Sequence, residues 1–182
     1  MIPNDDQYLV ARLKNSSEAE AAFKELVEQY QQRLYTHIRK MVISHSDTDD
    51  LLQDTFIKVY RNINSFREDS SLFTWLYRIA TNETLNFLKK KKRQYVFSTL
   101  DYEDQMVQSL KNDTYFDGDE AAFKLEQAIL KLPEKQRLVF NMKYYDDMKY
   151  QQIADILGTS VGGLKASYHH AVKKIEKFIL AE

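Results

Sequence analysis

Glycine is nearly absent from most of this chain, and that scarcity constrains the fold more than any other feature. The first 117 residues contain no glycine, and all four glycines lie between Gly118 and Gly163. Only two prolines occur in the 182 residues, Pro3 and Pro133. Tight turns between β-strands rely heavily on glycine, so a β-rich domain would lack the turns that it needs. The sequence therefore predicts an all-α protein.

The composition allows a folded core and excludes several kinds of site. Hydrophobic residues make up 43% of the chain and aromatic residues 13%, enough to bury one or two cores. The absence of cysteine excludes disulfides, thiolate metal sites and cysteine nucleophiles, and it suits a reducing compartment. No apolar run approaches the roughly 18 residues of a membrane span, and the first residues lack a signal-peptide pattern. We therefore expect a cytoplasmic protein.

Charge is distributed unevenly although the net charge is only −1. Residues 1–97 carry 15 basic and 13 acidic side chains, residues 98–120 carry one and seven, and residues 121–182 carry ten and seven, giving +2, −6 and +3. The acidic segment lacks sustained hydrophobic periodicity, which predicts a flexible linker. The chain thus divides into helical domains at 1–95 and 120–182, joined by an acidic linker at 96–119.

Hydrophobic spacing predicts the helices of both domains. In the first domain, helices are expected over about 18–35, 48–61 and 72–92, and in the second domain one begins near Glu120 and another opens at Pro133. The helix over 48–61 has an apolar face with Leu52, Phe56 and Val59. The i, i+3, i+4 rule places a mostly polar set on another face: Asp50, Gln53, Asp54, Ile57 and Arg61.

The segment from Tyr150 to Leu164 has the pattern of a helix-turn-helix. Ala154 is small where two helices cross, Gly158 suits a left-handed helix end, and Ser160 or Thr159 caps the next helix. An ordinary helical hairpin in a core would use the same features. Cationic or protonatable side chains on the second helix favour binding in a DNA major groove: Lys165, His169, His170, Lys173, Lys174 and Lys177. Gly162 and Gly163 would bring backbone amides close to a phosphate.

Five consecutive cations, Lys89 to Arg93, end the helix over 72–92. Alone, such a run is usually a solvated helix end. Aromatic, cationic and amide side chains precede it: Phe66, Arg67, Phe73, Trp75, Tyr77, Arg78, Asn82 and Asn86. Stacking and phosphate-pairing groups together suit single-stranded nucleic acid, although the aromatic residues fit a core equally well.

An enzyme is the class that the sequence supports least. The four histidines, His37, His45, His169 and His170, have no metal-ligand spacing. The acidic residues that follow His45 lack the turn glycine of a calcium loop and fit the first turn of a helix. No glycine-rich phosphate loop occurs. The sequence therefore predicts no catalytic residue, no metal and no cofactor.

Three segments, in the correct order, resemble the extracytoplasmic-function (ECF) sigma factors of bacterial RNA polymerase. The segment from Asp50 to Tyr60 resembles the polymerase-binding helix of their first domain, called region 2. Phe73 to Ala80, with Asn82 and the basic run, resembles the segment that reads and melts the −10 element. Leu132 to Phe140 with the helix-turn-helix resembles the domain that reads the −35 element, called region 4. A stand-alone helix-turn-helix regulator would explain only residues 120–180.

The resemblance implies a partner and a set of residues for each domain. Core RNA polymerase would bind Asp50, Gln53, Asp54 and Ile57. The −10 DNA would contact a loop that captures a flipped base and the helix after it: Phe66, Arg67, Ser70, Ser71, Arg78, Asn82, Asn86, Lys89 and Lys90. The −35 DNA would contact Ser160, Val161, Gly162, Gly163, Lys165, Ser167, Tyr168, His169, His170 and Lys173.

Further expectations come from the family alone. The acidic linker would thread a cationic channel of the polymerase, while its composition fits a plain solubilising linker equally well. A separate anti-sigma factor, in many relatives membrane-bound, would hold the chain inactive. Family members commonly carry arginines near the end of the recognition helix, where this chain has Ser167, His170 and Val172, and Gly163 replaces the usual threonine. The individual −35 contacts are therefore less well defined than the fold.

Overall fold

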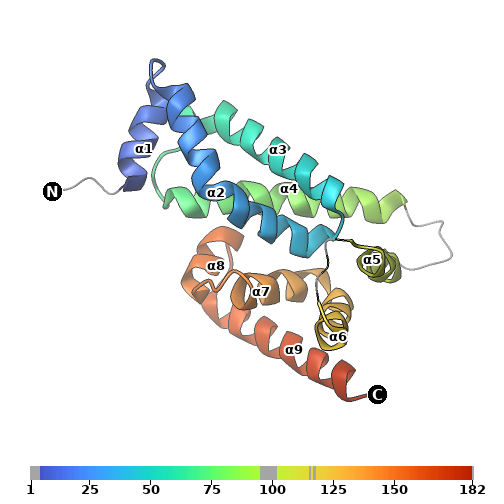
Figure 1. Cartoon of the computed structure of the whole chain (residues 1–182). Helices are drawn as coiled ribbons and strands as arrows, with labels where there is room; N and C mark the ends of the chain where they lie inside the picture. The colour runs from blue at the N-terminus through green and yellow to red at the C-terminus, as the bar shows by residue number, and fades with distance from the viewer. Residues whose placement is uncertain (1–4, 95–101, 115, 117, 182) are drawn as a thin grey trace.

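Helices are the only regular secondary structure in the residues that the structure describes, which confirms the all-α prediction. This computed structural model describes residues 5–94, 102–114, 116 and 118–181, and no strand occurs among them (Figure 1). The helices are α1 (Asp5–Lys14), α2 (Ala19–Val42), α3 (His45–Asn62), a 3₁₀ turn η1 (Ile63–Ser65), α4 (Leu72–Gln94), α5 (Tyr102–Lys111), α6 (Glu120–Leu130), α7 (Glu134–Tyr144), α8 (Tyr150–Leu157) and α9 (Val161–Leu180).

The N-terminal half, α1 to α4, packs around an apolar core. Leu26, Leu34 and Ile38 of α2 face Val59 of α3 and Leu76 of α4, and all five side chains have no exposed surface. A sharp turn at Ile43, where φ is 66°, ends α2. The Ser44 hydroxyl then caps α3 by accepting the Asp47 backbone N–H. This tight corner holds α2 and α3 side by side (Figure 1).

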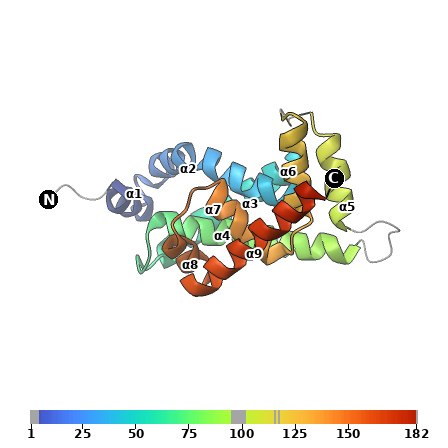
Figure 2. The ribbon, with the colours of Figure 1, turned by 90° about the horizontal axis from the view of Figure 1, so that it is seen from below.

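The C-terminal half, α6 to α9, contains the expected helix-turn-helix. Gly158 adopts the left-handed backbone, with φ of 64°, and ends α8. The Ser160 hydroxyl accepts the Gly163 N–H at 3.2 Å and caps α9. Ile153 of α8 and Leu164 of α9 are buried in the same core. The long helix α9 crosses the underside of this half (Figure 2).

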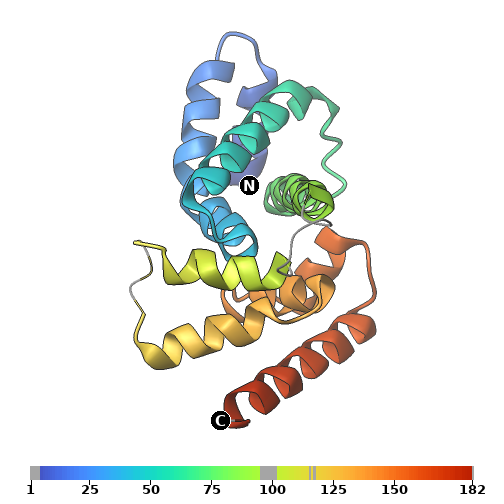
Figure 3. The ribbon, with the colours of Figure 1, turned by 90° about the vertical axis from the view of Figure 1, so that its right-hand side faces the viewer.

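Two helices depart from the sequence expectations. Helix α1 is not among the predicted helices, although Leu9, Val10 and Leu13 lie on one helical face and are buried. The expectation that segment 96–119 lacks periodicity is wrong for residues 102–111. They form α5, and Met106 and Leu110 pack against Ile43 and Leu130. Figure 3 shows α5 crossing between the end of α2 and α6. Met106 and Leu110, four residues apart, form an apolar side of α5 that is buried, although the segment as a whole is rich in acidic residues.

The two halves pack against each other along a seam between α2 and α4 on one side and α7 and α8 on the other (Figure 1). Leu138 and Met142 of α7, with Ile156 of α8, belong to the same apolar cluster as the core of the N-terminal half. Because Met142 is fully buried, the two halves share one continuous hydrophobic core at this contact.

Candidate polymerase-binding and DNA-binding surfaces

The outer face of α3 carries the expected polymerase-binding residues. Asp50, Gln53 and Asp54 are exposed, and Ile57 keeps 40% of its surface exposed. Thr55, Phe56 and Val59 are buried on the opposite face, because the helical repeat separates the two sets. The four residues therefore form one continuous patch on an outer helix of the molecule.

An apolar groove continues this patch toward α2. Phe23, Val27, Ile57 and Tyr60 line a groove of about 600 Å³ between α2 and α3. The Tyr60 ring packs edge-on against Phe23 at 5.0 Å between ring centres, yet more than half of its surface is exposed. Exposed apolar surface beside carboxylates is typical of a protein-binding site. Sequence reasoning missed this groove because its residues come from two helices.

The loop before α4 differs in part from the sequence expectation. Phe66 is expected to contact DNA, but only 5% of its surface is exposed and its ring packs on Trp75 at 4.9 Å between centres. Phe66 is therefore a core residue in this structure, because an aromatic ring in a polar loop gains most by burial. Arg67 is exposed, Ser70 is half-buried, and Ser71 caps α4 by accepting the Thr74 N–H at 3.1 Å.

The remaining expected −10 residues lie along α4. Asn82, Asn86, Lys89 and Lys90 are exposed. Arg78 is also exposed, but its guanidinium donates to the backbone carbonyl of Asp155 in α8 at 2.6 Å. One end of this row on α4, at Arg78, is therefore held in the contact between the two halves.

The expected −35 residues extend along α9 from its N-cap, Ser160, to Lys173. Most of them are exposed, namely Ser160, Gly162, Gly163, Lys165, His169, His170 and Lys173, while Val161 and Ser167 are half-buried. Tyr168 stacks on Phe140 with ring centres 5.6 Å apart. Tyr168 is therefore partly a packing residue, and its burial raises the pKa of its hydroxyl. A cleft of about 340 Å³ is lined by Gly163 and Ser167 together with Leu85 of α4, so both expected DNA-binding helices border it.

A polar ladder on α2, made of His37, Arg39 and Lys40, joins the first half to the rest of the chain. His37 is buried, and its ring nitrogens contact Asp146 Oδ2 at 2.8 Å and Thr81 Oγ1 at 3.0 Å. These two contacts connect α2 with α4 and with the turn after α7. No feature of the sequence indicates them.

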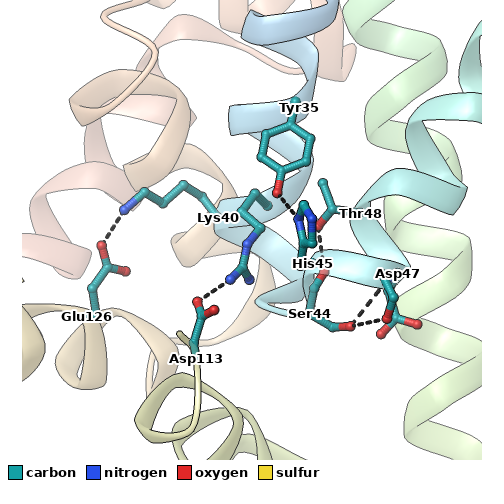
Figure 4. A network of polar contacts seen from close by, with 10 residues as sticks. Tyr35, Lys40, Ser44, His45, Asp47, Thr48, Asp113 and Glu126 are labelled. Carbon is teal, nitrogen blue, oxygen red and sulfur yellow. Dashed lines mark hydrogen bonds and ion pairs between the residues drawn. The ribbon is translucent and has the colours of Figure 1, made fainter. Parts of the chain in front are cut away.

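The other two ladder residues contact the turn after α5 and helix α6, where Figure 4 shows their partners Asp113 and Glu126. Lys40 Nζ lies 2.5 Å from Glu126 Oε1 and over the ring of Tyr145, and Arg39 pairs with Asp113. The Tyr145 hydroxyl donates to Glu126 at 2.8 Å. Burial, together with the neighbouring Glu126 carboxylate, raises the pKa of Tyr145. This partly buried charged pair and the Tyr145 hydroxyl thus join α2 of the first half to α6 and the end of α7.

The described part of the chain offers neither a metal cluster nor a membrane-spanning helix. No group of three or more histidine, aspartate or glutamate side chains there is arranged to hold a metal ion. None of its helices is long and apolar enough to cross a membrane.

Comparison with known proteins assigns the chain to a family. The family described as sigma-70 region 2 matches residues 26–94, and the one described as sigma-70 region 4 matches residues 122–175. The ECF RNA polymerase sigma factor SigW of Bacillus subtilis (strain 168) is 34% identical over 170 residues, which cover 86% of this chain and 88% of SigW. The chain belongs to the ECF sigma factors. The resemblance found in the sequence is confirmed.

Other relatives agree with this assignment. The ECF RNA polymerase sigma-E factor of Escherichia coli (strain K12) is 32% identical over 179 residues, covering 94% of this sigma factor and 92% of that protein. The structure of CnrH in complex with the cytosolic domain of CnrY matches with a TM-score of 0.69 at 22% identity, over 98% of this chain and 99% of CnrH. The sigma factor RpoE of Bartonella quintana, solved with the anti-sigma factor NepR, matches with a TM-score of 0.65 at 22% identity, over 86% of this chain and 96% of RpoE. These two structures share the fold.

Proposed function

We propose that this sigma factor binds core RNA polymerase, directs it to promoters with −10 and −35 elements, and helps to open the DNA. The observation that carries the proposal is the presence of regions 2 and 4 on one chain, each with an exposed surface of suitable chemistry. A stand-alone helix-turn-helix regulator would need only the second of these regions, so it is not favoured.

The polymerase contact is assigned to the α3 patch and the groove beside it. Asp50 and Asp54 supply charge that steers a basic partner, while Ile57 and Tyr60 supply apolar surface to be buried. The partner surface would then carry cations around an apolar ridge. Gln53, between the two carboxylates on the helical face, supplies hydrogen bonds.

The DNA contacts are assigned to the loop after η1, to α4 and to the start of α9. Arg67 and Lys89 carry positive charge for phosphates, and Asn82 and Asn86 carry amides for the edges of unpaired bases. Lys165 and Lys173 contact phosphates beside the major groove that receives α9. Captured bases and polymerase contacts offset the cost of unstacking, so opening needs no catalysis by this chain. RNA synthesis belongs to the polymerase, and we place both proteins in the cytoplasm.

An anti-sigma factor is the second partner that we propose. The solved relatives CnrH and RpoE were each captured with a second protein, CnrY or NepR. The exposed apolar groove between α2 and α3 offers such a protein a surface that polymerase also needs. Competition for that surface would keep the sigma factor inactive.

Co-elution with core RNA polymerase tests the main proposal. The purified chain is mixed with core enzyme on a sizing column, and transcripts started by the complex are sequenced. A stoichiometric complex that starts RNA at defined sites supports the sigma role. Firm binding to intact duplex DNA without any polymerase complex would instead favour the stand-alone regulator.

A further inference from the structure

Helix α1 lies beside the loop that leads from η1 into α4 (Figure 1). Lys14, at the end of α1, donates from Nζ to the backbone carbonyl of Phe66 at 2.9 Å and to Glu68 Oε1 at 2.9 Å. The ammonium also lies 5.8 Å from the centre of the Phe66 ring. One side chain thus holds two points of a loop more than fifty residues away in sequence. The match to region 2 begins only at residue 26, so α1 lies outside it.

The loop that Lys14 holds has a strained backbone. Glu68 has φ of 62°, a left-handed conformation that non-glycine residues adopt at a cost. A strained residue of this kind persists only when surrounding contacts fix it. The two bonds from Lys14 fall on Glu68 itself and on the carbonyl two residues earlier, so they are placed to hold this conformation.

The strained loop and α1 enclose a cleft of about 370 Å³. Asp6, Gln7 and Val10 form the wall on α1, and residues 68–72 form the opposite wall. The volume lies within the range of about 300–1,000 Å³ typical of small-ligand sites. Its lining is rich in carboxylate, amide and hydroxyl groups, which suit the hydrogen-bonding edge of a base that has left the stack.

We propose that Lys14 is a positioning residue for promoter opening: it holds the loop 66–71 in the shape that lets the cleft against α1 receive an unstacked base. This inference rests on the proposed function, because only a chain that opens DNA has such a base to bind. Lys14 need not touch the base. Lys14 acts on the base-binding cleft by fixing the loop conformation at Phe66 and Glu68.

The test compares Lys14→Met with Lys24→Met in the complete complex of sigma factor and core polymerase. Methionine keeps most of the side-chain length and removes the charge. Lys24 is an exposed lysine that pairs only loosely with Glu28, at 3.9 Å, so it matches the loss of charge without touching the loop. Lys14→Arg restores a cation that can donate to both acceptors. Circular dichroism and melting curves check that each variant is folded.

The readout is the fraction of open promoter complex on a promoter that the wild-type complex uses. Lys14→Met should lower the equilibrium constant for opening about tenfold, because it removes two hydrogen bonds from a charged donor. Lys24→Met should leave this constant unchanged, and Lys14→Arg should recover most of the loss. Binding to core polymerase should be the same for all four proteins.

Abasic sites placed one at a time along the non-template strand of the −10 element separate positioning from general stability. At one position, removal of the base should abolish the difference between wild type and Lys14→Met, while at the others the difference should persist. Equal opening by Lys14→Met and wild type, or a defect that no abasic site relieves, would overturn the role of Lys14. Failure of the wild-type complex to open DNA would instead refute the proposed function.

Discussion

The exposed face of α3 and the exposed face of α4 are both assigned to binding, but the fold treats them differently. The α3 patch of Asp50, Gln53 and Asp54 points outward on an outer helix. The α4 row begins at the seam, where Arg78 bonds α8, and Leu85 shares a cleft with α9. In this conformation the proposed polymerase-binding surface is exposed, while part of the proposed DNA-binding surface lies against the second half. The exposure of these two amphipathic helices thus depends on which elements pack beside them.

The seam that makes this difference combines apolar and polar contacts. Met142 and Ile156 supply buried apolar surface, and the ladder of His37, Arg39 and Lys40 supplies directional bonds. Apolar burial favours association but tolerates sliding, whereas paired charges favour one register. Substitutions on the two surfaces and in the seam can therefore separate their roles, beginning with the largest expected effect.

Charge reversal on α3 should have the largest effect. Asp50→Lys with Asp54→Lys places two cations where we expect a basic partner, so affinity for core polymerase should fall at least about a hundredfold, or roughly 3 kcal/mol. Fluorescence anisotropy of a labelled sigma factor titrated with core enzyme measures it. Glu28→Lys with Glu120→Lys, two exposed sites, makes the same charge change and should bind normally. Equal affinities of the two double variants for core polymerase would show that the α3 patch does not bind the polymerase.

Removal of His37 should loosen the seam. His37→Ala deletes the hydrogen bonds to α4 and to the turn after α7, and it leaves the buried Asp146 carboxylate without its histidine partner. We expect the free energy of unfolding to fall by about 2–3 kcal/mol. Urea denaturation followed by circular dichroism measures it.

His45→Ala is the matched control for the seam. His45 bonds Tyr35 within the N-terminal half and is more exposed, so the expected decrease in the free energy of unfolding is under about 1 kcal/mol. Hydrogen exchange should rise in α4 and α8 of the His37 variant only. A His37 variant as stable as the His45 variant would show that the two His37 contacts contribute little to holding the seam together.

Neutralising cations on α9 should weaken promoter binding and make its affinity depend less on salt concentration. In Lys165→Met with Lys173→Met, the slope of log K against log salt for promoter binding should become shallower by about 1 for each phosphate that the variant no longer neutralises. The control Lys24→Met with Lys111→Met removes two exposed lysines elsewhere. If the slope of the α9 variant matches that of this control, Lys165 and Lys173 do not contact the DNA phosphates.

How much of this comparison the sequence predicts depends on the range of the contacts involved. The exposure of Asp50, Gln53 and Asp54 follows from the helical repeat, which is local. The missed helices also have local signals, in the spacing of Leu9 with Leu13 and of Met106 with Leu110. The burial of Phe66 and the pairing of His37 with Asp146, 109 residues apart, depend on tertiary packing, and no spacing encodes them. The surfaces are therefore predictable as helical faces, but not the seam that partly covers one of them.

Alkaline pH should weaken the seam by the smallest of these effects. Burial raises the pKa of Tyr145 in the folded protein above the ordinary value of 10.0, so above about pH 10 the unfolded chain loses this proton first and folding stability falls. Tyr145→Phe removes that ionisation and should flatten the decline between pH 9.5 and about 11. Part of the decline should remain, because burial also raises the pKa of Tyr30, to about 12, and that of Tyr77. Tyr144→Phe, at an exposed neighbouring ring, should keep the wild-type decline. If both variants decline alike in urea titrations, Tyr145 does not couple the seam to pH.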